Sequence, residues 1–252
     1  MPQQAEIFAA SWWENNLLDE SFVEQQAQAL MALPLPYDLA AWLQQNFDAA
    51  SLVQSNEAQL EHRFIAPLLE QMGWHSVPQK VYTVQGKVAK PDWCLSLGAQ
   101  QADALLASGN DAASASTHMA AICEAKAWDK ALDTGRANLD NPHHQLMDYL
   151  ASLRVRFGIL TNGRHWRLYD TQEITARKTY LQIDLERVLQ LDDTVELQRA
   201  LALFAFFFGR DTYAPAQPDG DRASSTLAQA LERAQTHALA VEENLKAVIY
   251  GY

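Results

Sequence analysis

The sequence predicts an α/β domain with a central mixed β-sheet. Across the middle of the chain, the expected elements follow the order helix, three strands, helix and strand hairpin, which is typical of such a sheet flanked by helices. The dipeptide Asn162-Gly163 separates two short apolar runs and is a strong hairpin signal. Leu60, Phe64 and Leu68 form a stripe at helical spacing ahead of the strands.

Length and composition suit one substantial core. The chain has 252 residues, of which 48% are hydrophobic. The first residues carry no basic side chain and no apolar stretch follows, so we expect no signal peptide. The longest apolar run, Ala200 to Phe208, is too short to cross a bilayer, so we expect no membrane partner. Cys94 and Cys123 lie in apolar runs and are expected to be buried free thiols that pack, which favours a cytoplasmic protein.

The net charge of −12 is unevenly distributed along the chain. Residues 1–62 hold nine acidic residues and no Lys or Arg, and residues 182–252 are also acidic. Residues 63–181 carry a small positive excess. The acidity therefore lies in the flanking segments, so the net charge does not exclude a polyanionic partner for the middle of the chain.

The first third of the chain is expected to be helical. Ala5 to Leu18 has apolar residues at helical spacing, a second helix runs to about Leu33, and Tyr37 to Phe47 forms a third after Leu33-Pro-Leu-Pro36. Ser55-Asn56-Glu57 opens a strong helix that Pro67 should kink and Gly73 should end.

The strands are expected in the middle of the chain, at Gln79–Val84, Lys87–Leu97 and Met119–Ala127. Gly98 to Thr117 is rich in Ala, Ser, Asp and Gly and predicts a surface excursion. A polar loop (Asp129–Pro142) and an amphipathic helix (His143–Leu153) follow. The hairpin strands Phe157–Thr161 and His165–Tyr169 come next, and Thr179–Ile183 is an expected edge strand.

The tail returns to helix, with an apolar segment at Leu197–Phe208 and a linker-like break at Pro215–Asp221. The last helix repeats apolar residues at spacings of four and three from Leu227 to Val248. This pattern fits a docking helix or coiled-coil seam, and equally a helix packed on its own domain. We therefore divide the chain into an N-terminal helical cap (1–54), a core (55–190) and a C-terminal helical extension or connector (191–252).

Acidic and basic residues gather at the ends of two predicted strands. Asp92 begins one apolar run, while Glu124 and Lys126 close the next. Side chains two apart on a strand share a face, so Glu124 and Lys126 project together. Pairing of these strands would bring two carboxylates and an ammonium together, as in a metal site that hydrolyses phosphodiesters. Solvated strand ends produce the same pattern, so the triad alone is a weak signal.

Five motifs in order make the signal specific. The chain resembles the PD-(D/E)xK restriction-endonuclease-like nucleases, above all the N-terminal nuclease domains of type I restriction R subunits and of type IIG restriction–modification enzymes. The resemblance covers roughly Asn56 to Asp170, and the Asp92–Glu124 separation is longer than in compact members. The matching segments are Asn56-Glu57-Ala with Phe64–Trp74, Lys90-Pro-Asp92, Ile122-Cys-Glu-Ala-Lys126, Gln145–Tyr149 and Gly158–Tyr169.

The resemblance implies a role for each matched residue. Asp92, Glu124 and the backbone carbonyl of Ala125 would bind Mg²⁺, with Mn²⁺ able to substitute. Lys126 would orient or help deprotonate the attacking water and offset charge on the phosphorus. Glu57 matches an accessory acid that completes the metal site or orients Lys126, with Glu61 as the alternative.

Other residues have competing interpretations. Gln145 matches an element that supports the site and approaches the DNA backbone, whereas core packing is favoured for Tyr149. Arg164 and Arg167 are candidate DNA-binding residues, although the hairpin itself explains this segment equally well. His143-His144 lacks partners at zinc-ligand spacing and is favoured as a helix start. Trp93 and Trp128 flank the site and are favoured as core residues.

The implied function is Mg²⁺-dependent DNA endonuclease activity that leaves a 5′-phosphate, in a restriction or restriction–modification system for phage defence. The chain has no methyltransferase motif and no Walker A loop, so recognition is expected from a methyltransferase, specificity or motor domain or subunit. A homodimer is one route to a double-strand break. The competing interpretation is a catalytically silent nucleic-acid-binding or assembly module on the same fold, and RNA remains an alternative substrate.

Overall fold

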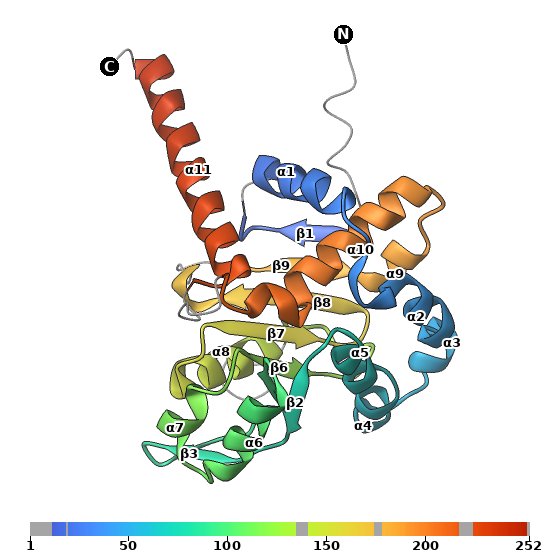
Figure 1. Cartoon of the computed structure of the whole chain (residues 1–252), viewed down its shortest axis with the longest axis vertical. Helices are drawn as coiled ribbons and strands as arrows, with labels where there is room; N and C mark the ends of the chain where they lie inside the picture. Colours follow the sequence, from blue (N-terminus) through green and yellow to red (C-terminus); the bar gives the residue numbers. More distant parts are fainter. Residues whose placement is uncertain (1–11, 19, 135–140, 174–177, 217–223, 251–252) are drawn as a thin grey trace.

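The structure is a computed structural model that describes residues 12–18, 20–134, 141–173, 178–216 and 224–250. A mixed sheet of seven strands lies at its centre, in the order β1-β9-β8-β7-β6-β5-β2 (Figure 1). All neighbours are antiparallel except β6 and β7. The strands are β1 (Trp13–Asn15), β2 (His75–Pro78), β5 (Trp93–Ser96), β6 (Ala121–Ala125), β7 (Phe157–Thr161), β8 (His165–Asp170) and β9 (Leu181–Asp184).

Helices cover both faces of this sheet, which confirms the predicted fold class. One face packs against α1 (Glu20–Met31), α2 (Leu39–Asn46), α3 (Ala49–Leu52), α4 (Glu57–Leu60), α5 (Ala66–Gln71), α9 (Leu185–Leu189), α10 (Thr194–Phe208) and the start of α11 (Thr226–Tyr250). The other packs against α6 (Ala99–Ala107), α7 (Ala112–Ser116), α8 (Pro142–Leu153) and a small separate hairpin of β3 (Tyr82–Val84) and β4 (Lys87–Ala89). Each face therefore has its own hydrophobic cluster.

The alternation of side chains along β6 fixes which face the site uses. Ala121, Cys123 and Ala125 are buried in the cluster that contains α10, while Ile122 is buried in the cluster that contains α8. Glu124 has the same parity as Ile122, so its side chain emerges on the α8 face. The burial of both cysteines, Cys94 and Cys123, as free thiols agrees with the sequence prediction.

The helix ahead of the strands begins and ends as its sequence predicts. Asn56 and Gln59 form a capping box at its start, and Gly73 follows its end with φ of 84°. Between α4 and α5 the chain makes a π-helical turn at Glu61–Ile65. Pro67 follows directly and has no N–H to donate, so it disrupts the regular ladder as expected. The irregular turn places Glu61 where the regular helix stops.

Long amphipathic elements were predicted well. The structure confirms the second N-terminal helix as α1, the amphipathic helix as α8, the hairpin strands as β7 and β8, and the terminal helix as α11. In α10 every residue from Ala200 to Phe208 is buried, as its continuous apolar run requires. The predicted linker Pro215–Asp221 lies largely outside the described residues, as does part of the loop Asp129–Pro142. The division at residues 54/55 and 190/191 stays a prediction.

The predicted helix at Ala5–Leu18 is wrong over its described part. Trp13–Asn15 form the strand β1, which pairs with β9 and lies at one side of the sheet. As a result β9, predicted as an edge strand, lies between β8 and β1. A three-residue strand is too short to show an alternating pattern. Its pairing partner β9 is also far away in sequence, so the local sequence does not reveal the strand.

Two further predictions need correction. The segments Gln79–Val84 and Lys87–Leu97 are not single strands: Gln79 has φ of 47°, and the chain leaves the main sheet there for the β3–β4 hairpin before returning as β5. The predicted surface excursion at Gly98–Thr117 instead folds into α6 and α7. Ala is the best helix former, and Leu105 and Ala115 anchor the two helices in the core.

Among the described helices, none combines the length and the apolar character needed to cross a membrane.

Candidate active site

Asp92 and Glu124 lie on neighbouring antiparallel strands and are held together by the backbone. Asp92 directly precedes β5, and Glu124 is the fourth residue of β6. An Asp92 carboxylate oxygen accepts a hydrogen bond from the Ala125 N–H at 2.8 Å, while the Asp92 N–H donates to Glu124 at 3.3 Å. The strand pairing therefore brings the two predicted acids together, as the sequence pattern required.

Lys126 completes the group from the same side of β6. Its Nζ lies 2.6 Å from a Glu124 carboxylate oxygen, and its backbone N–H donates to the Thr161 carbonyl on β7 at 2.8 Å. The parallel neighbour β7 thus fixes the backbone at the point where β6 ends. The predicted shared face of Glu124 and Lys126 is present in the structure.

Burial gives this group unusual electrostatics. Only 1% of Glu124 is exposed, and burial together with the nearby charge of Asp92 raises its pKa to about 7. Burial likewise raises the pKa of Asp92, against the effects of the Ala125 N–H and of Lys126. Burial works against the charged form of Lys126, but Glu124 and Asp92 outweigh it and raise its pKa. Two carboxylates that resist ionisation together favour a bound cation.

The two candidate accessory acids take different positions. A Glu57 carboxylate oxygen accepts a hydrogen bond from the Ala127 N–H at 3.1 Å, so this residue anchors the chain just after Lys126. Glu61 lines a cavity of about 370 Å³ together with Asp92. Burial and the charges of Asp92 and Glu57 raise the pKa of Glu61 to about 7. Glu61 therefore lines the cavity beside Asp92, whereas Glu57 is not among the residues that line it.

Gln145 and Tyr149 lie one turn apart on α8. The Gln145 side-chain amide donates to the Tyr149 hydroxyl at 3.0 Å. Burial raises the pKa of Tyr149; the Gln145 hydrogen bond lowers it, and the charges of Glu124 and Asp92 raise it. The pair is thus within electrostatic reach of the carboxylates. Tyr149 is only partly buried against the core, so the packing interpretation holds for it in part.

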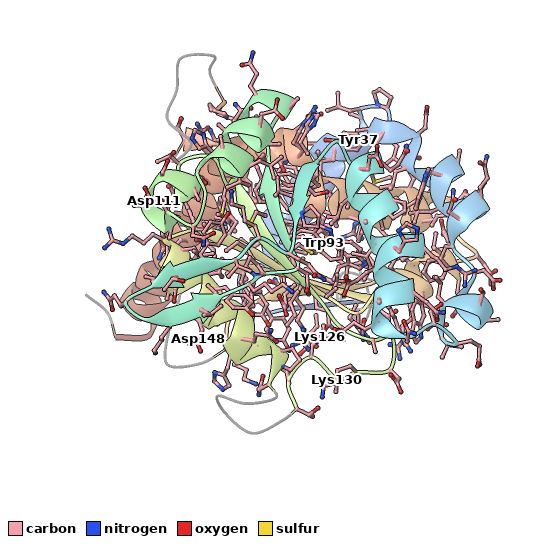
Figure 2. The ribbon with its side chains drawn as sticks, turned by 90° about the horizontal axis from the view of Figure 1, so that it is seen from below. Tyr37, Trp93, Asp111, Lys126, Lys130 and Asp148 are labelled. Carbon is pink, nitrogen blue, oxygen red and sulfur yellow. The ribbon has the colours of Figure 1, made fainter. Side chains whose placement is uncertain are left out.

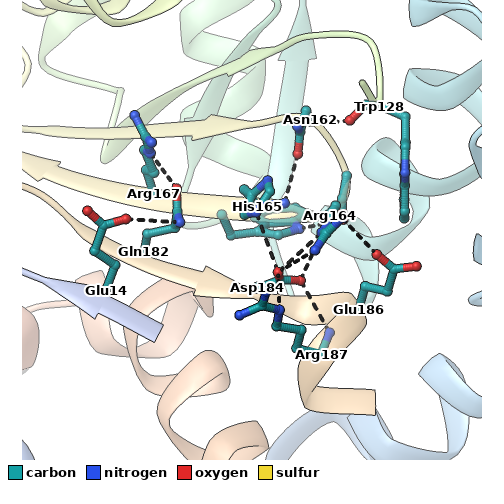
Figure 3. A network of polar contacts seen from close by, with 12 residues as sticks. Glu14, Trp128, Asn162, Arg164, His165, Arg167, Gln182, Asp184, Glu186 and Arg187 are labelled. Carbon is teal, nitrogen blue, oxygen red and sulfur yellow. Dashed lines mark hydrogen bonds and ion pairs between the residues drawn. The ribbon is translucent and has the colours of Figure 1, made fainter. Parts of the chain in front are cut away.

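The two candidate DNA-binding arginines are engaged elsewhere (Figure 3). Arg164 makes a two-pronged ion pair with Asp184 and contacts Glu186 at 3.1 Å. Only 6% of Arg167 is exposed, and its guanidinium is held by Asp133 at 2.8 Å and by Gln182 at 2.7 Å. Among the described contacts neither reaches the carboxylates, and the burial of Arg167 argues against a phosphate contact. Here the hairpin interpretation of the segment is the better one.

The remaining candidates are structural. Trp93 and Trp128 are buried, at 5% and 7% exposure. His143 is buried at the start of α8 against Tyr169. Within the described part of the chain, no three or more His, Cys, Asp or Glu side chains are grouped to hold a metal ion.

The donor set of the site nevertheless suits Mg²⁺. This ion typically takes one or two carboxylates and completes its shell with water and substrate phosphate oxygens, so a pair of acids is sufficient. Asp92 and Glu124 are such a pair, and burial raises the pKa of both. The residues present therefore fit the implied cation.

One supporting residue was missed by the sequence analysis. The Asn162 side-chain amide donates to the carbonyls of Trp128 and Lys130, at 3.0 and 3.1 Å, and so fastens the segment that follows Lys126. Asn162 was interpreted only as a turn residue. The burial of its amide, at 3% exposure, is what indicates the supporting role, and burial can be seen only in the three-dimensional structure.

Comparisons with known proteins add little to this geometry. No protein-family model and no curated protein matches the chain. Among solved structures, a chain of the cryo-EM structure of a DrdV–DNA complex is similar to it at 17% identity and a TM-score of 0.34. The match covers 74% of this chain but 14% of the other. A likeness this distant carries no functional argument, so the function must rest on the site.

Proposed function

We propose that the chain is a Mg²⁺-dependent endodeoxyribonuclease of a restriction type, with Mn²⁺ able to replace Mg²⁺. The observation that carries the proposal is the group of Asp92, Glu124 and Lys126 at the ends of adjacent strands. A buried carboxylate, a half-buried one beside it and an ammonium 2.6 Å from the first match the requirements of phosphodiester hydrolysis.

Each residue has a distinct task in this proposal. Asp92, Glu124 and the Ala125 carbonyl would hold the cation, which when bound supplies positive charge at the phosphate and makes water more acidic. Lys126 directs its ammonium toward the attacking water and offsets the charge that builds on the phosphorus. Glu57 keeps the Lys126 segment in place through its hydrogen bond to Ala127, and Glu61 borders the open side of the cavity.

The wider setting is also a proposal. Sequence recognition would come from a methyltransferase, specificity or motor component, because the sequence carries no methyltransferase motif and no Walker A loop. A homodimer would supply the second active site for a double-strand break.

Plasmid cleavage with Lys126→Ala tests the site. We expect nicking or linearisation in Mg²⁺ or Mn²⁺ that stops with EDTA and falls by at least about 100-fold in Lys126→Ala. Lys130→Ala is the matched control, because it removes a nearby exposed lysine side chain, and it should cleave like the wild type. Equal cleavage by Lys126→Ala and the wild type would contradict the assignment.

A calorimetric titration with Mn²⁺ separates an inactive site from an absent one. Binding that is lost in Asp92→Ala would support a competent metal site even where plasmid cleavage needs a partner. A folded wild-type chain that binds no metal would instead favour the catalytically silent module. Running DNA and RNA substrates side by side decides the substrate class.

A further inference from the structure

The β3–β4 hairpin is a separate, tightly turned arm. Its turn residues, Gln85 and Gly86, both have positive φ, at 49° and 78°, as in the two-residue turn that best matches strand twist. A side chain at Gly86 would meet nothing within 4 Å, so the turn stands in open space. Tyr82 and Ala89 are buried in the core at the base of the arm. The tip is thus exposed while the base is fixed.

A polar cavity of about 450 Å³ lies between this hairpin and α8. Figure 2 shows the hairpin next to α8, with Asp148 beside them and Lys126 farther along the same side of the molecule. The side chains that matter for binding are Lys87 and Val88 from β4 and Gln145, Asp148, Tyr149 and Ser152 from α8. Such a space is large enough for one nucleotide and offers both hydrogen-bond donors and acceptors.

This cavity adjoins the candidate active site. Gln145 and Tyr149 line it, and Tyr149 lies within electrostatic reach of Glu124 and Asp92. Anything bound in the cavity therefore contacts Tyr149, the α8 residue on which the charges of these carboxylates act.

Two exposed lysines lie at this position. Lys87 and Lys90 are both exposed, and among the described ion pairs neither has a carboxylate partner. By contrast Arg156, Arg164 and Arg167 are each paired with an acid. Among the described residues that line the cavity Asp148 is the one acid, so we expect an incoming phosphate to lie toward Lys87. Exposed, unpaired lysines beside a nucleotide-sized cavity suit a polyanionic chain.

We propose that the groove between the β3–β4 hairpin and α8 is a second DNA-contact site, which holds a nucleotide next to the cleaved bond with its phosphate at Lys87. The inference rests on the proposed function for its substrate. To the proposed function it adds where the DNA strand lies after it leaves the carboxylates, and which residues hold the DNA there. Val88, 67% exposed on the arm, borders the bound strand.

DNA binding in EDTA tests the charge part of this inference. We expect Lys87→Glu/Lys90→Glu to raise the Kd for a labelled duplex at least about tenfold at low salt. The slope of log K against log salt should shrink by about two, one for each lost phosphate contact. Arg233→Glu on α11 reverses an exposed cation elsewhere and should stay within about twofold of wild type. An unchanged Kd in the double variant would overturn the inference.

Crosslinking tests the location. The two native cysteines are buried, so a single new thiol can be addressed by an oligonucleotide that carries a disulfide tether. Val88→Cys should crosslink at least about tenfold faster than Val195→Cys, which places a thiol at a comparably exposed valine on α10. Equal rates at the two positions would contradict a DNA strand in the groove.

The two proposals fail in different ways. Metal-dependent cleavage together with unaltered DNA binding by the hairpin variant would keep the nuclease and overturn the groove. Weakened binding and selective crosslinking without cleavage would keep the groove as a DNA-contact site and count against the nuclease.

Discussion

At the scale of single residues, the site works against folding stability. Glu124 is almost fully buried and its pKa is raised to about 7, so ionising it near neutral pH costs free energy that Lys126 offsets only in part. A structural ion pair would gain more from a position at the surface, where desolvation is small. The buried position of Glu124 is consistent with a site that a bound cation and a substrate phosphate complete.

His143 provides the first prediction, because it is buried and has no role in the proposed chemistry. Burial lowers its pKa to about 4, and the charges of Lys178, His144 and Arg167 act in the same direction while Asp133 opposes them. The folded pKa is below the unfolded value of about 6.5, so the unfolded chain binds the proton more tightly between these values. Stability is therefore fully present above pH 6.5 and is lost as the pH falls toward 4, by up to about 3 kcal/mol.

Urea unfolding at several pH values measures this loss. His143→Phe, whose ring can still pack on Tyr169, should remove most of the decline between pH 6.5 and 4. His75→Phe replaces an exposed histidine and should keep the wild-type decline. A decline of equal size in His143→Phe would show that other groups cause it.

At the scale of elements, the packing of α8 on β7 determines where Gln145 and Tyr149 lie. A Cβ at Gly158 on β7 would come within 2.7 Å of Leu150 and 3.0 Å of Leu146, both buried on α8. Glycine at this position therefore lets the helix approach the sheet closely. The distance between α8 and the carboxylates therefore depends on the lack of a side chain at Gly158.

Gly158→Ala should accordingly push α8 away from the sheet. We expect a loss of about 1–3 kcal/mol of stability from overpacking, with a fall in any cleavage activity larger than the stability loss explains. Gly98→Ala is the matched control, because its new Cβ would meet only the flexible end of Gln101. Thermal unfolding and plasmid cleavage of both variants measure the effects. Similar unfolding of Gly158→Ala and Gly98→Ala would show that α8 adjusts without cost.

Predictability from sequence also varies by element. Long periodic helices such as α8 and α10 were predicted because each carries its own amphipathic or apolar pattern. The strand β1 and the division of Lys87–Leu97 were missed, since short strands are defined by partners far along the chain. Strand parity predicted that Glu124 and Lys126 share a face, while the inclusion of Asp92 rested on the order of the five matching motifs. The positions of Glu61, Asn162 and Arg167 depend on tertiary contacts that no spacing encodes.

At the scale of the whole molecule, the N- and C-terminal segments are joined to the core. β1 extends the central sheet at β9, and the Trp12 indole donates to Glu196 on α10 at 3.1 Å. The Trp74 indole donates to the Phe208 carbonyl at 2.8 Å. One hydrophobic cluster includes residues from all three segments that the sequence analysis separated. Because these contacts cross the boundary at residue 190, the chain up to that residue is expected to depend on the segment that follows it.

A chain shortened to residues 1–190 tests this directly. It lacks α10, whose residues Ala200 to Phe208 are all buried and include Phe204, Phe207 and Phe208 at 1% exposure or less. Each such ring contributes about 1.5–3 kcal/mol by burial, so their loss approaches the whole stability of a typical domain. We expect the shortened chain to lose cooperative thermal unfolding by circular dichroism and to bind a hydrophobic dye. A chain shortened to 1–237, which keeps the described buried residues of α11, is the control and should unfold cooperatively. If 1–190 instead melts sharply and binds Mn²⁺ like the full chain, the segment after residue 190 is not needed for folding.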